Sequence, residues 1–141
     1  LIPVRTLARR GRDTLLNPLP DMALRLEKPE MHSHLARLLD ENSYDIIQVE
    51  GIEMAPYVLG LLETRFFKAA DMRPRLVFDD HNAEYLLQKR AFSTDVHRPR
   101  RWLGAIYSLI QWQKLARYER RICQAADRVV AVSEADRNAL Q

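Results

Sequence analysis

Residues 45–79 read DIIQVEGIEMAPYVLGLLETRFFKAADMRPRLVFD. Two short apolar runs at the ends of this stretch predict strands: 45–49, which is rich in β-branched residues, and 75–79. The residues between them follow a helical period, carried by Val58, Leu61, Leu62, Phe66 and Ala69. The second run begins about 30 residues after the first, which is the spacing of a βαβ unit. We therefore expect two parallel, neighbouring strands.

The rest of the chain extends this pattern. A third apolar run covers 128–132, and helical patterns cover 30–42, 83–91 and 100–126. Ser133 to Asp136 resembles a capping box that opens a last helix. The strands are continuous apolar runs, which favours a parallel sheet with helices on its faces. The sequence predicts an α/β protein with a partial Rossmann-like sheet of about three strands.

The predicted sheet is small, because sheets of this class have about five or six strands. Residues 1–29 contain four of the seven prolines and no sustained period, so we expect an extended connection there. Residues 30–141 are then expected to form an incomplete domain. Its open sheet edges and apolar surface predict self-association, most simply as a homodimer.

Composition and charge narrow the function classes. The chain has 141 residues, is 47% hydrophobic and has one cysteine, Cys123, which excludes an internal disulfide and a multi-cysteine zinc site. We expect a cytoplasmic protein.

Residues 98–121 carry seven basic residues and a single acidic one, Glu119. Such a segment is suited to bind an anionic surface, although a solvated helix face has the same pattern. Nucleic acid is not an expected partner, because no reading motif accompanies the charge.

The helical segment 102–112 is apolar almost all round, with Trp102 and Trp112 near basic residues. Such a helix is buried or lies at a lipid boundary. Contact of 98–121 with the inner face of a membrane, packing as a core or lid, and contact with a protein partner all remain open.

Polar residues follow each predicted strand, where ligands of open α/β sheets bind. These turns are Glu50–Gly51, Asp80–His81–Asn82 and Ser133–Glu134. Helix starts near Asn82 and Ser133 would offer N–H groups to an anion, or the two side chains would simply cap their helices. A metal site is not expected, because the adjacent Asp79 and Asp80 point to opposite faces of a strand.

Four segments, taken together, resemble the N-terminal domain of family 4 glycosyltransferases. In order they are 44–51 (YDIIQVEG), 76–85 (LVFDDHNAEY), 118–123 (YERRIC) and 126–136 (ADRVVAVSEAD). The resemblance covers about residues 30–141. It implies two Rossmann-like domains facing each other across a cleft, with the C-terminal domain holding a nucleotide-sugar donor. That donor domain and the glycine-rich loop of the family are absent from this chain, so the chain alone is expected to be inactive.

The resemblance also implies roles for individual residues. His81 matches the catalytic histidine that reaches into the cleft near the donor sugar, and Asn82 and Glu84 belong to the same signature. Glu50 and Gly51 match a turn on the acceptor side, as Ser133 and Glu134 match the turn after the next strand. The implied reaction is sugar transfer from a nucleotide-sugar to an acceptor hydroxyl, with retained configuration and no metal cofactor.

Two other classes remain open from the residues themselves. One is a non-catalytic α/β interaction module that associates through its sheet edges and apolar helix. The other is a metal-dependent hydrolase built on Asp80 and His81.

Overall fold

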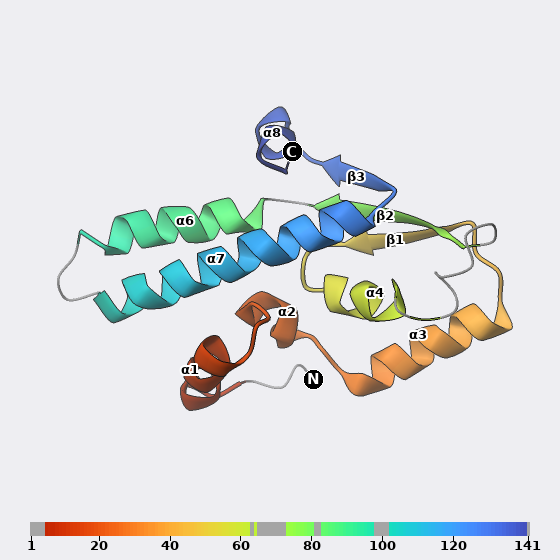
Figure 1. Ribbon diagram of the computed structural model, residues 1–141, viewed down its shortest axis with the longest axis horizontal. Helices are drawn as coiled ribbons and strands as arrows, with labels where there is room; N and C mark the ends of the chain where they lie inside the picture. The colour runs from red at the N-terminus through yellow and green to blue at the C-terminus, as the bar shows by residue number, and fades with distance from the viewer. Residues whose placement is uncertain (1–4, 63, 65–72, 81–82, 98–101, 141) are drawn as a thin grey trace.

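The computed structural model describes residues 5–62, 64, 73–80, 83–97 and 102–140. Its centre is a parallel sheet of three strands in the order β1-β2-β3, which confirms the α/β, partly Rossmann-like prediction (Figure 1). The strands are β1 (Ile46–Glu50), β2 (Arg75–Asp80) and β3 (Arg128–Ala131). Each lies within one residue of its expected bounds.

The register brings the carboxyl ends of the strands to one edge of the sheet. Glu50 pairs with Asp79, and Asp80 pairs with Ala131. At the opposite edge the side chain of Asp127 accepts the Leu76 N–H at 2.8 Å and binds Arg73 at 2.7 Å. These contacts lower the pKa of Asp127 to about 2, with the Arg73 hydrogen bond the main cause. Asp127 therefore fixes the start of β3 beside β2.

The core lies on one face of the sheet. Helices α4 (Ala55–Leu62) and α7 (Trp102–Ala125) cover this face. The fully buried residues of the core include Leu76 and Phe78 from β2 and Ile122 from α7. The alternation of buried residues along β2 carries Asp80 to this face as well.

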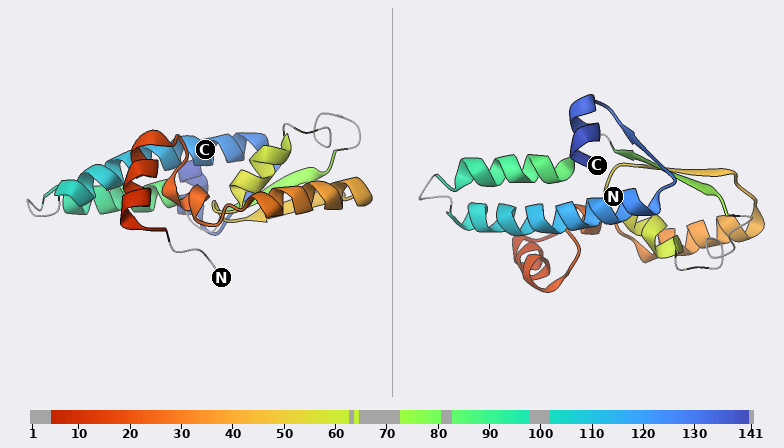
Figure 2. Two further views of the ribbon diagram at one scale, coloured as in Figure 1. Left: turned by 90° about the horizontal axis from the view of Figure 1, so that it is seen from below. Right: turned by 45° about the horizontal axis from the view of Figure 1, so that its top comes forward.

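Helix α6 (Glu84–Asp95) runs antiparallel to α7, and the pair projects beyond the sheet (Figure 2). Phe92 and Trp112 stack in this arm with ring centroids 6.3 Å apart. At the far end Trp102 and Leu103 are 59% and 67% exposed. Two further helices are α3 (Pro29–Glu41) and α8 (Glu134–Leu140). Within the described ranges, no helix is long and apolar enough to span a membrane.

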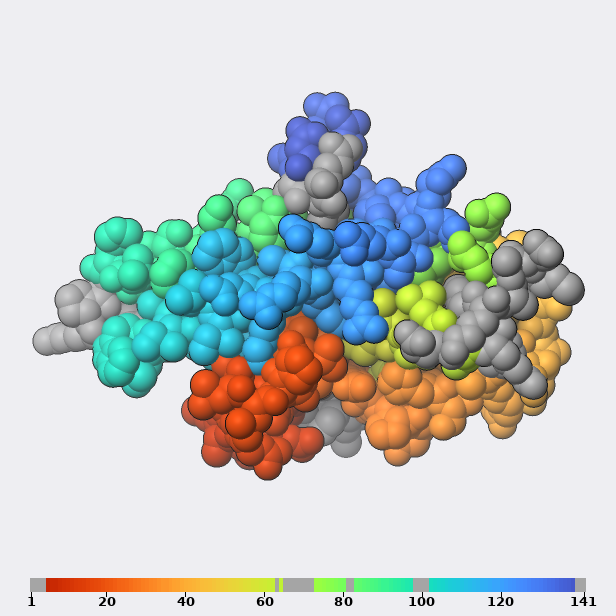
Figure 3. Space-filling view, in the orientation of Figure 1, coloured from red at the N-terminus to blue at the C-terminus, as the bar shows by residue number. Residues whose placement is uncertain are grey.

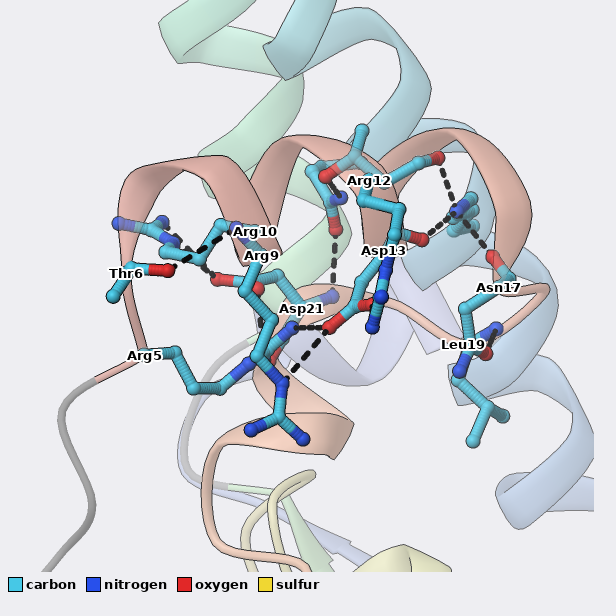
Figure 4. A network of polar contacts seen from close by, with 12 residues as sticks. Arg5, Thr6, Arg9, Arg10, Arg12, Asp13, Asn17, Leu19 and Asp21 are labelled. Atoms are coloured by element: carbon cyan, nitrogen blue, oxygen red, sulfur yellow. Dashed lines mark hydrogen bonds and ion pairs between the residues drawn. The ribbon is translucent and has the colours of Figure 1, made fainter.

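Residues 1–29 differ from the expected extended connection. They contain helices α1 (Leu7–Leu16) and α2 (Asp21–Arg25), which pack beneath α7 in Figures 1 and 3. Arg5 binds Asp13 at 2.6 Å and Asp21 at 2.8 Å, so ion pairs join the two helices (Figure 4).

Polar side chains of α7 complete this attachment. Gln111 accepts the Asp21 N–H at 2.8 Å and donates to the Thr14 hydroxyl at 3.1 Å. Lys114 donates to the carbonyls of Thr14 and Asn17 at the end of α1. The prediction of an extended segment was wrong because tertiary contacts stabilise both helices: α1 is held by polar contacts, and α2 also buries Ala23 in the core.

Candidate functional site

The turn after β1 places two predicted site residues at the carboxyl edge of the sheet. Gly51 has φ 78°, a left-handed conformation that favours glycine, and its N–H donates to Asp79 O at 2.9 Å. Glu50 is exposed, and Gln48 donates weakly to its carboxylate and to that of Asp79. The side chains of Gln48, Glu50 and Asp79 therefore form one open polar surface beside the turn. Of these three residues, the sequence predicted only Glu50 as a site residue.

The turn after β2 is described in part. His81 and Asn82 lie outside the described residues. Asp79 contacts Gln48 on the open face of the sheet, whereas Asp80 is 1% exposed on the core face. The two carboxylates therefore point to opposite faces, as expected from strand geometry. Over the described ranges, no group of three or more histidine, cysteine or acidic residues is arranged to hold a metal.

Glu84 opens α6 and faces the loop that follows β1. Burial raises the pKa of Glu84, nearby Glu53 raises it further, and Arg25 lowers it. Arg25 also lies 3.7 Å from the Glu53 carboxylate. Residues far apart in sequence, from α2, the β1–α4 loop and α6, therefore meet at this point. Glu53 and Arg25 were not predicted, because only the tertiary fold brings them to Glu84.

Ser133 and Glu134 border a different part of the edge. They line a hollow of about 780 Å³ between α7, β3 and α8. Ser133 caps α8 by accepting the Asp136 N–H at 3.1 Å, which confirms the helix start. Glu134 is exposed and lies 3.9 Å from Arg137. This hollow also includes Tyr85 of α6, whereas neither Gly51 nor Glu50 lines it.

The start of α6 differs from the expected anion site. Ala83, at the N-cap, has no side-chain oxygen to accept the first helical N–H groups. Instead, Ala83 N–H donates to Asp136 at 3.4 Å and Glu84 N–H donates to Glu119 at 2.9 Å. These donors are occupied by the protein's own carboxyl groups, so they are not open to a phosphate.

Cys123 lies one turn beyond Glu119 on α7 and borders the same hollow. Burial, followed by the charges of Asp80 and Glu119, raises the pKa of Cys123 to about 12. The thiol therefore keeps its proton at neutral pH and is a poor nucleophile.

The sequence model of Glycosyltransferase Family 4 matches residues 3–141. The chain belongs to glycosyltransferase family 4. No curated protein and no solved structure shows a significant match to it. The family match begins well before residue 30, where the resemblance of the four segments starts. Helices α1 and α2 are therefore part of the family 4 region.

Proposed function

We propose that this family 4 chain is part of a retaining glycosyltransferase that moves a sugar from a nucleotide-sugar donor to an acceptor hydroxyl. The family match over residues 3–141 is the observation that carries the proposal. The parallel strands support it, because they bring the turns after β1, β2 and β3 to one edge, where ligands of open α/β sheets bind.

In this proposal the edge of the sheet contributes the acceptor side of a cleft. Glu50 and Glu84 carry carboxylates suited to accept hydrogen bonds from sugar hydroxyls. Gly51 keeps the backbone of its turn close to a ligand. His81, Asn82, Ser133 and Glu134 keep the roles that the family resemblance implies. The reaction uses no metal cofactor, and the donor nucleotide is held outside this chain, so the chain alone is inactive.

The role of His81 is tested in the product of the complete reading frame that contains this chain. We expect His81→Ala to lower sugar transfer by at least tenfold and to change the free energy of unfolding by less than about 0.5 kcal/mol. Transfer rates and thermal unfolding of both proteins decide this. A variant with normal transfer would remove His81 from the mechanism.

Donor binding by the chain gives a second test. We expect calorimetry with nucleotide-sugars to show no affinity in the micromolar range. A micromolar dissociation constant would instead indicate a complete donor site within the 141 residues.

One surface supports a second proposed property, which is contact with the cytoplasmic face of a membrane. Trp102, Leu103 and Ile106 are exposed at the end of the α6–α7 arm, and Lys89 and Arg90 are exposed on α6. An exposed tryptophan on an arm that also carries basic residues suits an anionic lipid interface. We expect flotation with vesicles rich in phosphatidylglycerol but not with phosphatidylcholine vesicles. If the double variant Trp102→Ala/Ile106→Ala floats with the anionic vesicles as completely as the wild type, this contact is contradicted.

A further inference from the structure

The start of α6 depends on a carboxyl group that belongs to another helix. Glu119 lies on α7, 1% exposed, and its Oε1 accepts the Glu84 N–H at 2.9 Å. It also accepts the backbone N–H of Tyr85. Because Ala83, at the N-cap, has no capping oxygen, Glu119 acts in place of an N-cap side chain at this helix start.

The second oxygen of Glu119 lies in a different environment. Among the described residues, Glu119 Oε2 is buried and has no hydrogen-bond donor. The Glu119 carboxyl group also contacts that of Asp80, which ends β2 and is itself 1% exposed. Two buried carboxylates in contact repel each other, and a proton between them turns the repulsion into a hydrogen bond.

We propose that Glu119 is a positioning residue, which shares a proton with Asp80 and holds the start of α6 against the end of β2. One carboxyl group thereby links α7, β2 and α6. The importance of this link for sugar transfer rests on the proposed function, because Glu84 and the turn after β2 belong to the implied site. The link itself rests on the fold alone.

The electrostatics agree with a protonated Glu119 at neutral pH. Burial, the largest cause, and the charge of Asp80 raise the pKa of Glu119 to about 8, although the hydrogen bonds from Glu84 and Tyr85 act in the opposite direction. The proton is therefore present at pH 7 and leaves as the pH rises through about 8. Glu119 lines the hollow together with these ionisable or charged residues: Cys123 and Arg120 on α7, Tyr85 on α6, and Glu134 and Arg137 on α8. Asp136 of α8 contacts the Ala83 N–H at the same helix start.

The loss of this proton has a structural consequence. Two negative charges then face each other at the junction of β2 and α6. We expect the start of α6 to loosen as the pH rises from the ordinary carboxyl pKa of 4.5 towards about 8, because the opened state releases the Glu119 proton near the lower value and the closed state only near the higher one. The ionised state of a buried acid is the costly one, so the link is stable at low pH and weak at high pH.

The test follows the amides of Glu84 and Tyr85 by NMR between pH 6 and 9.5 in the 141-residue chain. In the wild type we expect a step near pH 8 in their chemical shifts, and a fall in their hydrogen-exchange protection factors that begins below pH 8 and levels off above it. Glu119→Gln keeps the acceptor oxygen and donates an N–H to Asp80, so it should retain protection and lose the step. Glu119→Ala should lower protection about tenfold at pH 7.

Two controls separate this link from general effects. Glu41→Gln changes an exposed glutamate on α3 and should leave the step unchanged. His81→Asn removes the titratable neighbour of Asp80 in the chain and should also leave it unchanged. A step that persists in Glu119→Gln, or that only His81→Asn abolishes, would overturn the proposal, as would full protection in a folded Glu119→Ala.

No sugar or catalytic activity enters these measurements. If the chain shows the step but its parent protein transfers no sugar, the Glu119–Asp80 link is supported and the proposed function is contradicted. If the parent protein transfers sugar but the chain shows no step, the function is supported and the link is contradicted.

Discussion

At the residue scale, the strand-end turn at Gly51 shows how sequence chemistry sets the site. The glycine was predicted as part of a strand-end turn where ligands of open α/β sheets bind. The structure adds a conformational reason, since φ at Gly51 is 78° and a side chain there is strained. Its N–H bond to Asp79 also ties the turn to β2.

We therefore expect Gly51→Ala to lower the free energy of unfolding by about 1 kcal/mol or more. Gly11→Ala is the matched control, because Gly11 lies inside α1 with open space around its Cα. That change should leave stability equal or raise it by up to about 1 kcal/mol. Urea unfolding of both variants measures the difference. Equal destabilisation by the two changes would show that the conformation of Gly51 is not special.

Other residue-scale features were not predictable from the sequence. Glu119 appears there as one acid among seven basic residues of 98–121, which is typical of a solvated helix face. Its burial against Asp80 depends on how α7 crosses the end of β2. The contact of Asp136 with the start of α6 likewise joins residues 53 positions apart. Local patterns predict strand ends and caps, but they do not predict which distant carboxyl group completes a helix start.

At the element scale, the strands were predicted well and the first two helices were not. The strands are continuous apolar runs between clear breaks, so their period and length are visible locally. Helix α1 instead carries exposed leucines, Leu7, Leu15 and Leu16, on its apolar positions. Its hydrogen bonds with Gln111 and Lys114 of α7 join residues 97 and 100 positions apart. No local rule places such a helix.

Lys114 gives a direct test of this attachment. Its ammonium group donates to carbonyls of Thr14 and Asn17, which the end of α1 leaves without helical partners. We expect Lys114→Met to lower amide protection in α1 about tenfold while the amides of β2 keep theirs. Hydrogen exchange followed by mass spectrometry measures this.

Arg117→Met is the control for that change. Arg117 lies three residues further along α7 and is exposed. Removing its charge should leave α1 protected. Equal loss of protection in both variants would mean that the net charge of α7, and not the contact of Lys114, holds α1 in place.

At the scale of the whole molecule, the described surface carries several exposed apolar groups. Val130 and Val132 are 46% and 61% exposed at β3, which pairs only with β2 among the described strands. Ile46 on β1 is 59% exposed, and Ile106 is exposed on α7. Unpaired strand edges and apolar patches favour association.

We expect the chain to form a homodimer at micromolar concentration, measured by light scattering after size exclusion. Ile106→Glu distinguishes the two surfaces, since it should dissociate a dimer formed through α7 and leave one formed through the sheet edges intact. A monodisperse monomer at high micromolar concentration would show that the chain covers its own core.

The central claim is that this chain belongs to a glycosyltransferase that retains the configuration of the transferred sugar. The most direct measurement is proton NMR of the reaction product made by the full reading-frame protein from a panel of α-linked nucleotide-sugars and hydroxyl acceptors. We predict a product with an α-linked sugar. A β-linked product, or no transfer from any donor by a folded protein, would contradict the account.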